Sequence, residues 1–90
     1  MAIDIRKPHN KSLSDAQGIA DELARDLADK FSINYGWEGD TIRFERFGVN
    51  GQIAVSEEAV HIQATLGFLL SALEPRVEAE IHRYLDEHFV

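Results

Sequence analysis

From residue 33 to residue 66, apolar and polar residues alternate along the chain almost without a break. Side chains of a β-strand point alternately to its two faces, so a period of two predicts strands with one apolar and one polar face. We expect strands near residues 33–38, 41–46, 52–56 and 59–65. Their apolar positions are Ile33, Tyr35, Trp37, Ile42, Phe44, Ile53, Val55, Val60, Ile62, Ala64 and Leu66.

The links between these strands are short and rich in turn-forming residues. Gly39 and Asp40 lie in the first link, and Asn50-Gly51, a pair typical of tight hairpins, lies near the second. Ser56, Glu57 and Glu58 make up the third link. Links of this length cannot carry a crossover, so we expect antiparallel pairing throughout.

Amphipathic helices are expected on both sides of this region. Residues 12–31 repeat apolar side chains at helical spacing, and either Ser12 or Ser14 could cap the helix. A second helical pattern follows Gly67, with Ser71 as a candidate cap and Pro75 in the first turn. The charged residues of both segments, including Asp26, Lys30, Glu80 and Arg83, are expected to face solvent.

A short additional strand is expected near residues 3–6, and Pro8 should end it. The predicted order is therefore β-α-β-β-β-β-α. Each helix has one apolar stripe and the sheet has one apolar face, so both helices should pack on that face. The expected fold class is α+β, a two-layer antiparallel sheet with two helices, as a single domain over residues 1–90.

Composition narrows the classes of partner. The chain has 90 residues and a formal net charge of −7, and phosphate backbones repel such a surface, so nucleic acid is not expected as a partner. The longest apolar run is Phe68-Leu69-Leu70, too short to span a membrane, and the N-terminal residues do not resemble a signal peptide. We therefore expect a cytoplasmic protein with no membrane span.

The sequence contains no motif for catalysis or for a cofactor. It has no cysteine, no nucleophile elbow and no glycine-rich phosphate loop. Its four histidines are dispersed, and the i,i+4 pair Glu78 and His82 is better explained as a surface pair than as a metal site. No catalytic residue, cofactor or metal is predicted, and we expect a protein that is not an enzyme.

Two features could serve binding instead. Phe47 breaks the strand alternation beside Gly48, and Phe68-Leu69-Leu70 carries more apolar side chains than one direction of a helix can bury. Phe47, Phe68, Leu69 and Leu70 are therefore the candidate apolar contact surface, because exposed patches of this kind mark contacts with partners or surfaces. Burial of the same residues in the core is the alternative, and it holds also for Tyr35, Trp37 and Phe44.

Four segments, in this order and at these spacings, resemble the small polyhydroxyalkanoic acid (PHA) system proteins of bacteria. They are Trp37-Glu38-Gly39-Asp40-Thr41, Phe44-Glu45-Arg46, Gly48-Val49-Asn50-Gly51 and Leu66-Gly67-Phe68-Leu69-Leu70-Ser71-Ala72-Leu73. The resemblance covers nearly the whole chain. It implies an association with bacterial polyester storage, because genes of such proteins lie among those for granule synthesis and granule-surface proteins, and it implies no assigned catalytic or binding residue.

Three hypotheses follow for the function. The first is a non-enzymatic accessory protein of PHA storage that binds a granule surface or a granule-associated protein through an apolar patch. The second is a small carrier that encloses an acyl chain between the sheet and the C-terminal helix, for which a pocket of about 300 Å³ or more is needed. The third is a homodimeric scaffold that associates through a free edge of the sheet.

Overall fold

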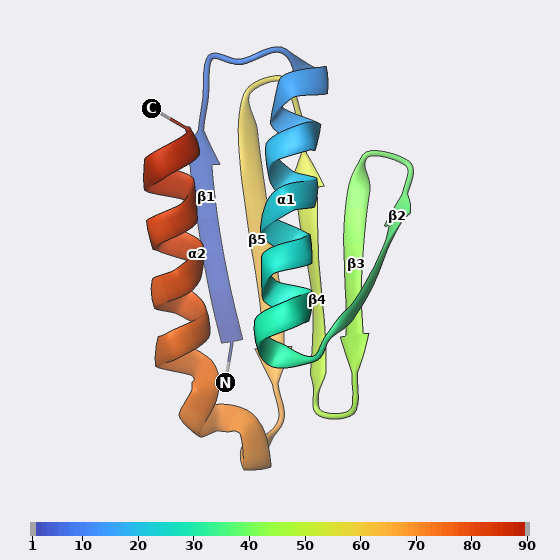
Figure 1. Cartoon of the computed structure of the whole chain (residues 1–90), viewed down its shortest axis with the longest axis vertical. Coiled ribbons are helices and arrows are strands. Elements are labelled where there is room, and N and C mark those ends of the chain that lie inside the picture. Colours follow the sequence, from blue (N-terminus) through green and yellow to red (C-terminus); the bar gives the residue numbers. More distant parts are fainter. Residues whose placement is uncertain (1, 90) are drawn as a thin grey trace.

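The computed structural model describes residues 2–89, without the side chain of Leu69, as an antiparallel sheet with two α-helices on one face (Figure 1). The strands are β1 (Ala2–Pro8), β2 (Asn34–Glu38), β3 (Thr41–Arg46), β4 (Val49–Val55) and β5 (Ala59–Leu66). The helices are α1 (Leu13–Phe31), the short 3-10 helix η1 (Phe68–Leu73) and α2 (Glu74–His88). The predicted α+β class and the order of strands and helices are confirmed.

The strand order, which the sequence alone does not determine, is β1-β5-β4-β3-β2. All neighbours are antiparallel, and the three hairpins β2–β3, β3–β4 and β4–β5 account for four of the five strands. The first strand joins the sheet next to β5, with Ile5 opposite Ile62. As a result, β1 and β2 form the two edges of the sheet.

The core lies between the helices and the apolar face of the sheet. Ile42, Ile53 and Ile62 occupy neighbouring register positions on three adjacent strands, and all three are almost fully buried. Above them, Ala20 and Ala24 of α1 are fully buried; these small side chains let the helix lie close to the sheet. In Figure 1, α1 lies over the middle of the sheet and α2 lies over β1. The predicted apolar stripes are therefore the faces that the helices bury.

The two helix starts differ from each other. Ser12 caps α1, since its Oγ accepts a hydrogen bond from the backbone N–H of Asp15 at 3.1 Å. The predicted cap at Ser71 is wrong: its hydroxyl donates instead to the carbonyl of Phe68 at 2.8 Å, within η1. The chain makes a 3-10 turn first, and α2 begins only at Glu74 with Pro75 in its first turn, where a missing N–H is harmless.

The predicted Asn50-Gly51 turn is also wrong. Both residues lie inside β4, and the chain reverses at Phe47-Gly48, where Gly48 has a φ of +84°. Glycine adopts such a left-handed backbone without a steric penalty, so Gly48 takes the role that the Asn-Gly pair was expected to fill. Gly51 instead allows a close approach within the sheet, because a Cβ atom there would lie 2.9 Å from the carbonyl oxygen of Gln63.

Candidate functional site

The β3–β4 turn presents a phenylalanine to solvent. Its loop has only two residues, Phe47 and Gly48, between the paired Arg46 and Val49. A side chain at the tip of such a loop extends beyond the end of the sheet and cannot reach the core. The Phe47 side chain is accordingly 92% exposed.

A second exposed phenylalanine lies on the neighbouring segment. Phe68 is the first residue of η1 and is 89% exposed. Gly67, just before it, donates its backbone N–H to the carbonyl of Gly48 at 2.7 Å, so the two segments are held together by a backbone hydrogen bond. Leu70 donates its N–H to the carbonyl of Gly67 at 3.0 Å, which closes the first turn of η1. The two exposed rings therefore project from one fixed backbone unit.

Leu70 fills the space behind these rings. It is half-buried and lies directly over Gly48, since a Cβ atom added at Gly48 would lie 2.9 Å from Leu70 Cδ1. The β3–β4 turn and the start of η1 together form a hollow of about 280 Å³ that is open to solvent. Its lining residues are Arg46, Phe47, Gly48, Gly67, Phe68 and Leu70. We call the exposed apolar part of this surface, formed by Phe47, Phe68 and Leu70, the apolar apex.

The apolar apex contains three of the four residues predicted as the contact surface. The side chain of Leu69, the fourth, lies outside the described part of the structure. Of the other predicted aromatics, Phe44 is in the core, Tyr35 is half-buried, and Trp37 is 38% exposed on β2. Core burial is therefore correct for Phe44, whereas Phe47 and Phe68 are the most exposed large apolar residues among those whose side chains the structure describes.

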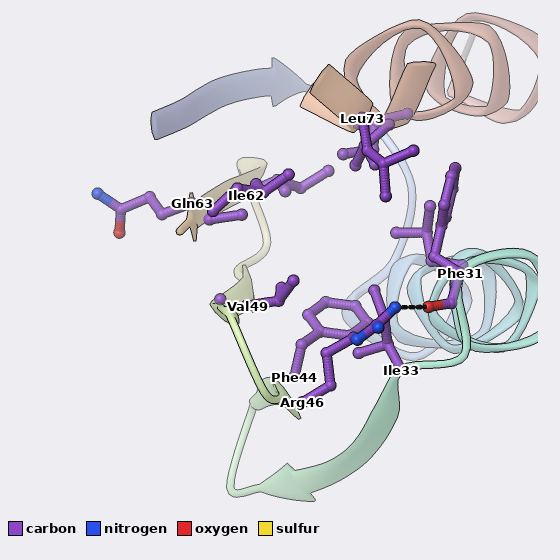
Figure 2. Close-up of a pocket in the computed structure, with 14 residues that line it drawn as sticks. Phe31, Ile33, Phe44, Arg46, Val49, Ile62, Gln63 and Leu73 are labelled. Carbon is purple, nitrogen blue, oxygen red and sulfur yellow. Dashed lines mark hydrogen bonds between the residues drawn. The ribbon is translucent and has the colours of Figure 1, made fainter. Parts of the chain in front are cut away.

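One charged residue links the apolar apex to the helices. Arg46 is half-buried, and its Nη1 donates to the carbonyl oxygen of Phe31 at 2.6 Å (Figure 2). That carbonyl belongs to the last turn of α1, where carbonyl groups have no partner within the helix and a positive charge is favourable. Arg46 thus links the β3–β4 hairpin, and with it the base of the apolar apex, to the end of α1.

The interior next to this arginine contains a small apolar cavity of about 30 Å³. Figure 2 shows Phe31, Phe44 and Leu73 around it, while the Gln63 side chain points away. A cavity of this volume has room for about one water molecule, and a drug-sized ligand needs roughly 300 Å³ or more. The cavity that residues 2–89 enclose between the sheet and the helices is therefore far smaller than the acyl-chain carrier hypothesis requires.

The comparisons with known proteins agree with the resemblance. A family model described as "Putative polyhydroxyalkanoic acid system protein" matches residues 3–89. The chain belongs to this PHA-system family. No curated protein matches the chain, and no solved structure matches it.

Two of the segments that carry the resemblance to the PHA-system family meet at the apolar apex. They are residues 48–51, which begin at the β3–β4 turn, and residues 66–73, which include the whole of η1. The hydrogen bond from Gly67 to Gly48 joins the two segments directly. A third segment, residues 37–41, forms the β2–β3 turn at the other end of the hairpin.

A charged seam between the two helices is the polar feature that sequence reasoning missed. Glu80 of α2 accepts from Lys30 of α1 at 2.8 Å and also from Arg83, and its side chain is only 15% exposed. The Arg83 and Lys30 hydrogen bonds lower the pKa of Glu80 to about 2. Helical spacing placed these residues on the solvent side, but the seam lies where the edges of the two helices meet.

Two further groups of the seam have a raised pKa instead of a lowered one. Asp26, beside Lys30, has a raised pKa, chiefly because burial disfavours the charged carboxylate, and its Oδ2 has no hydrogen-bond partner among residues 2–89. Burial and the contact with Glu22 raise the pKa of Tyr84 to about 12. Ion pairs of this type join packed helices, and neither Glu80 nor Asp26 lines the interior cavity or the hollow at the apolar apex. We therefore assign the seam to structure.

His9, His61 and His82 each contact a different partner. His61 contacts Asp4 on the open face of the sheet at 2.6 Å, and His9 contacts the carbonyl of Ser56 at 2.8 Å. His82 lies 3.8 Å from Glu78, as the i,i+4 spacing implies. Within residues 2–89, no three side chains of the histidine, cysteine, aspartate or glutamate type come close enough together to hold a metal ion. Neither helix in that range is long and apolar enough to cross a membrane.

Proposed function

We propose that this chain is a cytoplasmic, non-enzymatic accessory protein of PHA storage that binds the polyester surface of a granule through its apolar apex. The observation that carries the proposal is the exposure of Phe47 and Phe68, 92% and 89%, which line one hollow and belong to two segments joined by a backbone hydrogen bond. Exposure of two neighbouring phenyl rings to water is unfavourable in free energy. Exposed apolar patches of this kind mark surfaces that a partner covers.

The energy available from such a contact supports the proposal. Full burial of one phenylalanine side chain is worth about 1.5–3 kcal/mol, so the two rings supply roughly 3–6 kcal/mol when an apolar surface covers them. Because both rings project from short, hydrogen-bonded turns, little backbone order has to be gained on binding. A polyester surface can cover two exposed rings, whereas an acyl chain would need an enclosed pocket.

The hollow between the rings supports the same conclusion. It is about 280 Å³, open to solvent and lined mainly by apolar atoms, with Arg46 at its base. A polyester surface presents apolar backbone carbons together with ester carbonyl groups. The Arg46 guanidinium has further N–H donors beyond the one that binds Phe31, and these are available to donate to an ester carbonyl oxygen at the edge of the contact.

Co-sedimentation of the purified protein with PHA granules tests this function. We expect binding to protein-stripped granules that exceeds binding to polystyrene beads of equal surface area, because the proposed partner is the polyester itself. Binding to native granules but not to stripped ones would show that the partner of the apolar apex is a granule-associated protein and not the polyester. Equal adsorption to polystyrene would show non-specific hydrophobic adsorption and contradict the proposal.

A further inference from the structure

The two edges of the sheet differ in how they are protected against pairing with another strand. The β1 edge carries Asp4, Arg6, Lys7 and Pro8, and charged residues and proline are the usual means by which natural edges avoid association. The β2 edge has the sequence Asn-Tyr-Gly-Trp-Glu, with one charge, at its end, and all its residues except Tyr35 are exposed. Of the two edges of the sheet formed by residues 2–89, β2 is therefore the one without this protection.

The register of the hairpin shows which backbone groups on β2 are free. Gly39 and Asp40 form a two-residue loop, so the flanking pair Glu38–Thr41 is hydrogen-bonded, and every second pair after it is too. Gly36, opposite Arg43, is next in this series. The N–H and C=O groups of the alternate residues, Tyr35 and Trp37, must then point away from β3. No strand within residues 2–89 pairs with that side of β2.

We propose that this edge binds the β2 edge of a second copy of the chain. In an antiparallel pair centred on Gly36, Tyr35 of each copy lies opposite Trp37 of the other. The outward groups of these residues then form four backbone hydrogen bonds, and the two aromatic side chains on each side of the axis form a cross-strand pair. The result is a two-fold symmetric dimer with a continuous sheet across both copies.

The side chains of β2 are complementary to themselves in this register. Asn34 lies opposite Glu38 and Gly36 lies opposite itself, so no like charges face each other across the axis. Glu38 is already paired with Arg43 at 2.7 Å. The carboxylate of Asp21, which accepts the indole N–H of Trp37 at 2.9 Å, is paired with Arg25 at 3.1 Å. The chain is acidic, but these two carboxylates at the edge, Glu38 and Asp21, are each paired with a cation.

A cysteine at the symmetry axis tests this register. In the proposed dimer Gly36 forms a non-hydrogen-bonded pair with its own copy, and the Cα atoms of such a pair are about 4.5 Å apart, within the range of a disulfide. The chain has no cysteine, and a Cβ at Gly36 meets no atom within 4 Å, so Gly36→Cys adds one thiol without strain. Gly18→Cys is the matched control, since a Cβ there also meets nothing within 4 Å.

Under mild oxidation, we expect Gly36→Cys to give a disulfide-linked dimer and Gly18→Cys to stay monomeric on a non-reducing gel. In sedimentation velocity, the wild type should dimerise with rising concentration, and Gly36→Lys, which puts two lysines at the axis, should stay monomeric. Gly18→Lys controls for the added charge. A wild type that is monomeric at about 1 mM would overturn the proposal, and so would a Gly36→Lys variant that dimerises like the wild type.

Discussion

At the scale of single residues, two glycines of the sheet have opposite surroundings. A Cβ at Gly51 would lie 2.9 Å from the carbonyl oxygen of Gln63 and 3.1 Å from the Cβ of Ala64, whereas a Cβ at Gly36 meets open space. We expect Gly51→Ala to lower the free energy of unfolding by about 1–3 kcal/mol, because the backbone of β5 would have to move. Gly36→Ala should leave it unchanged or raise it by up to about 1 kcal/mol. Urea unfolding of both variants measures this difference, and equal effects would contradict the register.

Glu80 provides a residue-scale test of the helix seam. Its pKa of about 2 is below the ordinary value of 4.5, so its ionised form stabilises the fold. That contribution is complete above about pH 4.5 and is lost as the pH falls toward 2. We expect Glu80→Gln to cost about 2 kcal/mol at pH 7 and to flatten the fall in stability over that pH range.

The control for this substitution is Glu87→Gln. Glu87 also contacts Arg83, at 3.1 Å, but its side chain is 53% exposed, and exposed pairs are worth well under about 1 kcal/mol. Thermal unfolding of both variants between pH 2 and pH 7 gives the comparison. If the two substitutions had the same effect, Glu80 would be an ordinary surface residue and the seam would not hold the helices together.

At the scale of the elements, the period of the apolar residues predicted all the long strands and both α-helices. The prediction succeeded because each of these elements buries one apolar face, and the period of the buried side chains differs between helix and strand. The pairing was predictable because the links between strands are too short for anything but antiparallel neighbours. The period could not choose between Ser12 and Ser14 as the cap of α1, since both precede the helical pattern. It also misplaced the second hairpin, because a turn at Phe47-Gly48 puts an aromatic residue at the loop tip, where propensity alone favours Asn50-Gly51.

The cap of α1 can be tested directly. Ser12 Oγ accepts from the Asp15 N–H, whereas no hydrogen bond of the Ser14 side chain is found within residues 2–89. We expect Ser12→Ala to lower the free energy of unfolding by about 1 kcal/mol and Ser14→Ala to change it little, since alanine is a good helix former. Chemical denaturation of the two variants side by side decides the point. A larger loss for Ser14→Ala would place the start of the helix two residues later.

At the scale of the whole molecule, the apolar apex and the open β2 edge make different contacts. The β3–β4 turn and η1 lie together at the lower end of the molecule in Figure 1, near the start of β2. The proposed two-fold axis runs through Gly36 and reverses the strand direction, so it places the two apolar apices at opposite ends of the dimer. A dimer of this shape would contact two separate apolar surfaces at once.

This geometry predicts that the wild type clusters stripped PHA granules. Gly36→Lys should bind granules as tightly as the wild type and fail to cluster them, because each copy keeps its apolar apex but loses its partner. Light scattering of a granule suspension measures clustering, and sedimentation of the same samples measures binding. Clustering by a monomeric Gly36→Lys variant would show that the bridge between granules does not run through β2.

The site was only partly accessible from the sequence. A break in the alternation at Phe47 and an excess of apolar residues at Phe68-Leu69-Leu70 indicated a surface, but a buried face and a binding face have the same residue types. The exposure of Phe47 and Phe68 in the folded chain distinguishes the two. The backbone hydrogen bond from Gly67 to Gly48 then brings their segments together, although these lie about twenty residues apart in the chain. The helix seam was missed for a related reason. The spacing of residues in one helix shows which side of that helix is apolar, but it does not show which residues of a second helix lie beside it.

The most direct test of the account compares the wild type with the Phe47→Ser/Phe68→Ser double variant for binding to protein-stripped PHA granules. Both rings are exposed, so the variant should unfold at the same denaturant concentration as the wild type, while its affinity for the granules should fall by roughly 100-fold or more. Trp37→Ser, which alters an exposed aromatic residue outside the apolar apex, should bind as the wild type does. A folded double variant that binds granules as tightly as the wild type would contradict the central claim.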